Sequence, residues 1–164
     1  MPHDRLSPER RSWNMSRIRS KNTKPEIMVR SVLHRMGFRF RVHYSKLPGC
    51  PDIVLPKHRV VIFVHGCFWH RHPGCRRATT PGSNKAFWKK KFERNVARDQ
   101  EKRKDLEELG WRVLTIWECS VLEGPDRIAQ VVEEFMGRRG EYTFPSKREL
   151  LRAAQAGADY GKCT

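Results

Sequence analysis

The chain has 164 residues, enough for one domain with one hydrophobic core. Lysine and arginine total 34 against 18 acidic residues, which gives a formal net charge of +16. A charge of this size indicates a polyanionic partner, most often nucleic acid. A membrane partner is disfavoured, because no basic helix has a broad apolar face and the longest apolar run, Val60 to Val64, is too short to cross a bilayer.

The first residues and the cysteines bear on the cellular compartment. Residues 1–13 lack the apolar segment of a signal peptide. Five cysteines make an odd number, whereas secreted disulfide frameworks usually have an even one. We therefore expect a cytoplasmic protein whose thiols are reduced or bound to metal.

The N-terminal third predicts an arm, a helix and a strand. Residues 1–22 are polar and basic, and we expect an arm that becomes ordered on its partner. A capping box follows, with Thr23 as N-cap and Glu26 at N3, so a helix is predicted that ends at Gly37. Apolar and polar residues then alternate over residues 38–44, which predicts a strand.

The remaining pattern completes an α/β fold. Two short apolar segments, residues 52–55 and 60–64, predict a hairpin. A long basic helix with one apolar stripe is expected over roughly residues 84–109, then a strand over 111–117 and a helix from about Asp126. This order predicts a central mixed β-sheet flanked by helices. The expected organisation is an arm, a domain and a peripheral tail, at residues 1–22, 23–138 and 139–164.

The loop after the hairpin contains potential zinc ligands. Cys67, His72 and Cys75 lie close together, and Cys119 follows the last predicted strand. If that strand lies beside residues 60–64, Cys119 completes a Cys3His site, which would be structural because no ligand position stays open. The alternative is that the cysteines pack as small hydrophobic residues and the histidine faces solvent.

Several residues near this loop could perform metal or acid–base chemistry. Asp52 begins a strand, and its carboxylate could hold Mg2+ together with a backbone carbonyl and a substrate phosphate. His65 or His70 could deprotonate a water molecule. Asp99 lies on the apolar stripe of the long helix, where it needs a partner, either a histidine that it orients or an arginine. Glu26 has its capping role and could also lie close to the metal residues.

Two adjacent aromatic residues, Phe68 and Trp69, occupy the same polar loop and should expose at least one large ring. Packing explains most such pairs, but in a strongly basic protein insertion between base pairs is an alternative. Met15 in the basic arm could act as a second wedge. The candidates for phosphate contact include Arg17, Arg19 and Lys89.

Several motifs together resemble the very-short-patch repair endonuclease family over roughly residues 12–122. The most specific is HGCFWH at residues 65–70. The others are KN and PE at 21–22 and 25–26, LPG and PD at 47–49 and 51–52, NV and RD at 95–96 and 98–99, and WEC at 117–119. The resemblance implies a restriction-endonuclease-like fold. It also implies Mg2+-dependent nicking of duplex DNA, 5′ to the thymine of a T·G mismatch left by deamination of 5-methylcytosine.

The resemblance also implies roles for individual catalytic residues. Asp52 resembles the aspartate that binds Mg2+, and Val64 would add its backbone carbonyl. His70 resembles the general base and Asp99 its acidic partner. Two further residues resemble accessory catalytic groups, His65 and Glu26.

Structural and DNA-contacting residues follow from the same resemblance. Phe68 and Trp69 match an intercalating pair, with Met15 as the opposing wedge. Four residues match the ligands of a structural Zn2+ ion, namely Cys67, His72, Cys75 and Cys119.

Two other functions are compatible with the sequence. One is a related nuclease of a restriction or defence system without mismatch preference, and the other is a non-catalytic, zinc-stabilised DNA-binding protein. For the mismatch-repair endonuclease implied by the resemblance, we expect a nucleoid-associated monomer that binds double-stranded DNA and no membrane. Other mismatch-repair proteins are then the further partners to consider.

Overall fold

The computed structural model describes residues 7–17 and 21–137. In this part of the chain, four strands form one sheet in the order β1-β2-β3-β4. The strands are β1 (Arg41–Val42), β2 (Ile53–Leu55), β3 (Val60–His65) and β4 (Arg112–Trp117). The first three pair antiparallel, whereas β4 pairs parallel with β3. The predicted mixed sheet and the hairpin between β2 and β3 are therefore confirmed.

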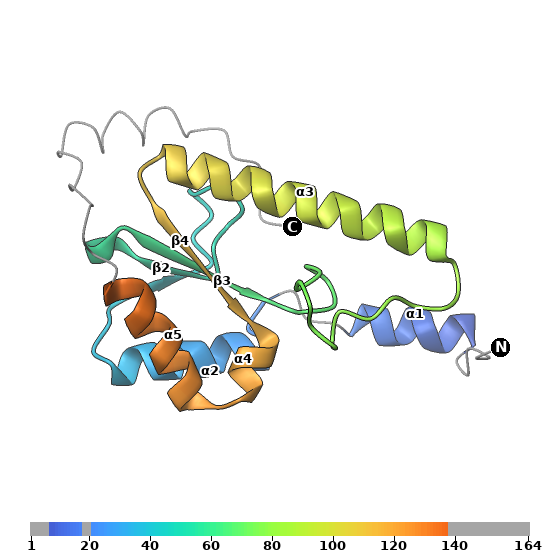
Figure 1. The fold of residues 1–164 in the computed structure, drawn as a ribbon, viewed down its shortest axis with the longest axis horizontal. Coiled ribbons are helices and arrows are strands. Elements are labelled where there is room, and N and C mark those ends of the chain that lie inside the picture. The colour runs from blue at the N-terminus through green and yellow to red at the C-terminus, as the bar shows by residue number, and fades with distance from the viewer. Residues whose placement is uncertain (1–6, 18–20, 138–164) are drawn as a thin grey trace.

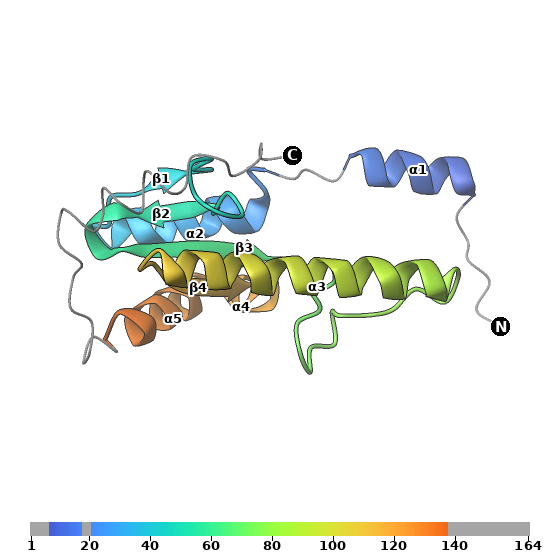
Figure 2. The same ribbon diagram turned by 90° about the horizontal axis from the view of Figure 1, so that it is seen from above.

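Helices cover both faces of the sheet (Figures 1 and 2). On one face lie α2 (Lys24–Arg35), α4 (Glu118–Leu122) and α5 (Pro125–Gly137), and on the other runs α3 (Lys85–Glu108). Alternation along the strands supplies both cores, because successive side chains point to opposite faces. In β2, Ile53 and Leu55 pack toward α2 and α5, while Val54 packs toward Leu106 of α3.

Local sequence explains the two helices that position the site. Thr23 caps α2, and the reciprocal capping box with Glu26 is present. In α3 the predicted apolar stripe is buried at Trp88, Phe92 and Leu106. Gly110 follows α3 with a φ of 77°, a left-handed conformation that favours glycine and lets the chain turn back into β4.

The parallel register of β3 and β4 matters most for the site. His65 lies opposite Trp117, so the two strands end at the same edge of the sheet. The loop that follows β3 and the short helix α4 that follows β4 therefore begin side by side. This arrangement fulfils the condition on which the sequence-based expectation for Cys119 rested.

The structure differs from expectation in three elements. The strand expected over residues 38–44 is reduced to Arg41–Val42, because the chain turns at His43, whose φ is 46°. Helix α1 (Pro8–Ser16) lies within the expected arm, where no helix was predicted. Helix α4 was also missed. The predicted tail at 139–164 lies outside the described residues, and the arm and tail boundaries stay predictions.

Within residues 7–17 and 21–137, no helix is both long and apolar enough to cross a bilayer.

Candidate active site

The loop after β3 folds back on itself and meets α4. Backbone hydrogen bonds from His70 to Gly66 and from His72 to Cys67, both 3.1 Å, close two tight turns. The Cys67 N–H also donates to Glu118 at 3.3 Å, which ties the loop to the first turn of α4. The loop is thus held rigidly enough to place side chains on both of its sides.

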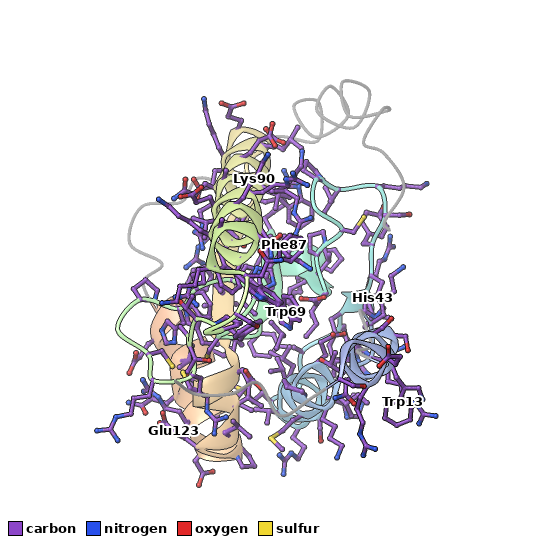
Figure 3. The ribbon with its side chains drawn as sticks, turned by 90° about the vertical axis from the view of Figure 1, so that its right-hand side faces the viewer. Trp13, His43, Trp69, Phe87, Lys90 and Glu123 are labelled. Atoms are coloured by element: carbon purple, nitrogen blue, oxygen red, sulfur yellow. The ribbon has the colours of Figure 1, made fainter. Side chains whose placement is uncertain are left out.

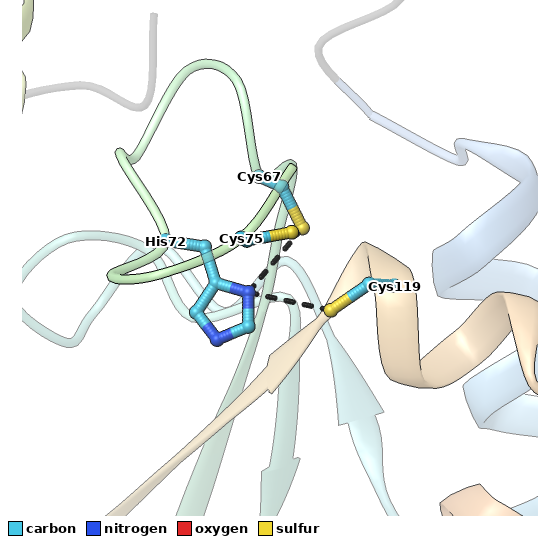
Figure 4. Close-up of side chains that lie close together, drawn as sticks. All are labelled: Cys67, His72, Cys75 and Cys119. Carbon is cyan, nitrogen blue, oxygen red and sulfur yellow. Dashed lines mark hydrogen bonds between the residues drawn. The ribbon is translucent and has the colours of Figure 1, made fainter. Parts of the chain in front are cut away.

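One side of this loop forms a cysteine and histidine cluster (Figure 4). The potential ligand atoms of its four residues all lie within 4.8 Å of one another; the residues are Cys67, His72, Cys75 and Cys119. Nδ1 of His72 is 3.3 Å from the Cys119 sulfur and 3.7 Å from the Cys67 sulfur. The four residues predicted as one ligand set therefore lie together.

The donor set fits a soft or borderline metal ion such as Zn2+. Burial raises the pKa of the Cys67 thiol to about 12, so without a cation this thiol keeps its proton. At Cys75, a backbone hydrogen bond from Arg77 lowers the pKa of the thiol. Three sulfurs and one imidazole nitrogen make a set of four ligands, the number and type that are typical of structural zinc sites.

The other side of the loop carries a histidine pair. His70 Nδ1 lies 2.5 Å from Asp99 Oδ2 on α3, and the rings of His65 and His70 stack with centroids 3.8 Å apart. The partner of Asp99 is thus a histidine rather than an arginine. Asn95, which the sequence analysis did not assign, donates to the Trp69 carbonyl at 3.1 Å and fixes the loop over α3.

His65 is largely buried beside His70. Burial and, to a smaller extent, the neighbouring His70 together lower the pKa of His65 to about 3. His65 is therefore uncharged at neutral pH. It can donate or accept a hydrogen bond, and it does not repel a proton that His70 takes up.

Asp52 lies directly before β2 and points across the hairpin. Its Oδ2 accepts a hydrogen bond of 2.8 Å from the Val64 N–H, so the carboxylate and the Val64 backbone are adjacent. Burial raises the pKa of Asp52 to about 6, which outweighs the opposing effect of that hydrogen bond. No hydrogen bond from the described residues reaches Oδ1. A half-buried carboxylate with a free oxygen fits a hard divalent ion, which would satisfy its charge.

The raised pKa of Asp52 predicts how stability depends on pH. Because the folded protein disfavours the charged form, its free energy of unfolding without added Mg2+ should fall as pH rises from the ordinary pKa of 3.8 through about 6. Asp52→Asn removes this loss. At about pH 8 the melting temperature of the variant should therefore be higher than that of the parent. At about pH 4 the two melting temperatures should be equal. Calorimetric melting curves check this. A difference in melting temperature that stays the same between about pH 4 and about pH 8 would contradict it.

Glu26 is the one buried charged residue among those described, with 3% of its surface exposed. Thr23 Oγ1 and the Asn22 N–H lie 2.8 and 3.0 Å from its carboxylate oxygens. Arg30, one turn along α2, donates to it at 2.9 Å. Arg30 in turn contacts His43 Nε2 at 3.0 Å. Sequence reasoning missed both partners: the i,i+4 spacing could have indicated Arg30, but His43 reaches the site only through its left-handed turn.

The aromatic pair is more buried than expected. Phe68 packs edge-on against Trp88 and Phe92 of α3, with centroids 5.5 and 5.2 Å apart, and Trp69 is also half-buried. The expectation that one of these two rings is exposed was therefore wrong. A neighbouring exposed ring on α3 is Phe87, which is 52% accessible and packs edge-on against Trp88 with centroids 5.5 Å apart; Figure 3 labels Phe87 and Trp69.

The predicted DNA-contacting residues are partly described. The Arg17 guanidinium lies 4.3 Å over the ring of Trp13, which is 53% exposed on α1. Lys89 is exposed on α3 and lies 3.9 Å from Glu93. Arg19 and the side chain of Met15 lie outside the described part of the chain.

The candidate catalytic side chains open into one cleft of about 1230 Å³ between α2, β3 and α3. Its lining includes all five predicted catalytic side chains, namely Glu26, Asp52, His65, His70 and Asp99. Asp52 and His70, from separate elements, thus face the same space. A polyanion held there would meet a carboxylate suited to a metal ion and an imidazole oriented by a carboxylate.

Similarity to known proteins shows the family of this chain. Residues 3–77 match the family model of DNA mismatch endonuclease Vsr. The DNA mismatch endonuclease Vsr of Escherichia coli (strain K12) is 43% identical over 126 residues, 77% of this chain and 78% of the relative. The Type II nicking enzyme V.XorIIP of Xanthomonas oryzae pv. oryzae is 56% identical over 118 residues, 72% of this chain and 86% of the relative. The Type II nicking enzyme V.NmeAIP of Neisseria meningitidis is 42% identical over 118 residues.

The fold, the cleft and these relatives together define a DNA endonuclease. More particularly, the chain belongs to the Vsr family of DNA mismatch endonucleases.

Proposed function

We propose that this endonuclease nicks duplex DNA 5′ to the thymine of T·G mismatches that arise from deamination of 5-methylcytosine. The observation that carries the proposal is the convergence of Asp52 and the His70–Asp99 pair on one cleft. The name of the Escherichia coli relative supports the mismatch specificity. A non-catalytic DNA-binding function has no use for a carboxylate and an oriented histidine together.

In this mechanism Asp52 and the backbone carbonyl of Val64 would hold Mg2+, whose charge would supply electrostatic stabilisation of the phosphate and of the leaving 3′ oxygen. His70 accepts the proton of the attacking water. Because its Nδ1 is occupied by Asp99, its Nε2 is the atom that takes this proton. Asp99 fixes the ring and stabilises the resulting imidazolium. The uncharged His65 leaves that proton uptake unopposed.

The remaining site residues bind and deform the DNA in this proposal. Phe68 and Trp69 enter the mismatched step, with Met15 opposite, because unstacking is less costly at a mismatch. Exposed basic groups contact the phosphates, at Arg17, Arg19 and Lys89. A structural Zn2+ ion would be held by Cys67, His72, Cys75 and Cys119, and it would brace the loop that carries both His70 and the aromatic pair.

The proposed specificity predicts a difference between two duplexes that differ in one base. The nicking rate with Mg2+ should be higher on a T·G duplex than on the T·A duplex of the same context. A difference of 10- to 100-fold, or about 1.4 to 3 kcal/mol, is expected from the cheaper deformation of the mismatch. Single-turnover nicking of end-labelled duplexes measures it.

The main alternative is a nuclease of a restriction or defence system that has no mismatch preference. Several relatives are named Type II nicking enzymes, so the comparison must be made directly. Equal nicking of the two duplexes would contradict the repair function and favour this alternative.

A further inference from the structure

The guanidinium of Arg30 lies between two groups that ordinarily bind cations. One terminal nitrogen, Nη2, is 2.9 Å from Glu26 Oε2 and 3.0 Å from His43 Nε2. The other, Nη1, is 2.7 Å from Asn22 Oδ1. The side chains of Arg30 and Glu26 retain 16% and 4% of their exposure. Arginine is charged at every physiological pH, so this is a fixed, largely buried positive charge.

The same place has the ligands of a divalent-ion site. Potential ligand atoms of Glu26, His43 and Asp52 all lie within 4.8 Å of one another. Because arginine can only donate, the 3.0 Å contact with Arg30 requires the tautomer in which His43 Nε2 carries a lone pair, as in a metal-binding imidazole; the same nitrogen lies 3.2 Å from Asn22 Oδ1. Two carboxylates and one imidazole are a common donor set for Mn2+, Co2+ and related ions. Arg30 therefore occupies the ligand atoms that such an ion would need.

Backbone conformation supports a positioned network rather than a chance contact. Asn22 and His43 both have left-handed backbones, with φ values of 53° and 46°. Such conformations are uncommon outside glycine, although asparagine and histidine adopt them more readily than most residues, and here side-chain contacts accompany them. The two side chains converge on Arg30 from different segments, before α2 and after β1.

We propose that Arg30 is a positioning residue whose guanidinium takes the place of a divalent ion between Glu26 and His43. Ion binding in the cleft is then confined to the side of Asp52 that faces Val64. Glu26 acts through its charge and the capping box, not as a metal ligand. The inference concerns the ion site of the proposed function but does not depend on mismatch specificity.

Replacing Arg30 with a neutral residue should create a new metal site. In zinc-loaded protein without DNA, titration with Mn2+ followed by electron paramagnetic resonance should show one more bound ion in Arg30→Met and Arg30→Gln than in the parent. Arg30→Lys, which keeps a cation there, should match the parent. Spin-echo spectra should show the nitrogen coupling of a directly bound imidazole in Arg30→Met, and adding His43→Ala should abolish it.

Matched controls make the outcome decisive. Arg35→Met removes an exposed arginine from the same helix and should leave the number of bound ions unchanged. The inference is overturned if Arg30→Gln gains no ion. It is equally overturned if the parent already shows imidazole-bound Mn2+ that His43→Ala removes, a measurement that requires no Arg30 variant to fold. Failure to nick T·G duplexes would contradict the proposed function while leaving these ion counts as they are.

Discussion

Asp52→Asn is expected to lower the rate of nicking by on the order of 10³-fold, because it removes the charged oxygen that would hold the catalytic ion in the proposed mechanism. The substitution keeps the shape of the side chain and an oxygen that can accept the Val64 hydrogen bond. DNA binding should therefore be retained, since the basic surface is untouched. Single-turnover nicking and a gel-shift titration on the same T·G duplex measure the two quantities separately.

The control must carry the same change of charge, because any lost carboxylate strengthens DNA binding by a basic protein. Asp126→Asn in the first turn of α5 is suitable, since its side chain is exposed and lies outside the cleft lining. It should nick like the parent. Retention of nicking in Asp52→Asn would refute the mechanism, as would a parallel loss of binding and nicking.

The second large effect is expected at the cysteine and histidine cluster. Cys119→Ser should abolish stoichiometric zinc binding, because serine is a poor ligand for Zn2+ and the other three ligands share one loop. The loss should destabilise the fold by about 3 to 5 kcal/mol, or lower the melting temperature by about 10 °C. Metal analysis of purified protein and differential scanning calorimetry provide the two readouts.

Ser120→Ala, at the next residue of α4, controls for disturbance of the helix itself. It should retain zinc and melt close to the parent. The zinc assignment fails if the parent, purified without chelators, contains no zinc. Equal zinc content in Cys119→Ser would also contradict it.

Much of this architecture could be predicted because its determinants are local. The capping box fixed the start of α2, and short apolar segments joined by a turn indicated the β2–β3 hairpin. The ligand set also followed from one topological assumption, that the last strand lies beside residues 60–64. The family resemblance supplied residue roles that spacing alone left open, such as the choice of His70 over His65.

What could not be predicted depends on contacts between distant segments. The left-handed turn at His43 shortens β1 and carries the imidazole to Arg30, and no local pattern signals it. The burial of Phe68 results from packing against α3. This helix begins only at Lys85, 17 residues further along the chain. The lowered pKa of His65 and the raised pKa of Asp52 likewise arise from burial in the cleft, which exists only in the folded chain.

The loop between Cys67 and Cys75 has a consequence for how the enzyme can be inactivated. His70 and the aromatic pair lie between residues of the proposed zinc set, so damage to that set should also displace the proposed general base. Thiol oxidants should thus abolish cleavage although no cysteine takes part in the chemistry. Strong chelators would act by two routes, because they would remove either ion. Restoration of cleavage by added magnesium would identify the reacting ion, and restoration by added zinc would identify repair of the scaffold.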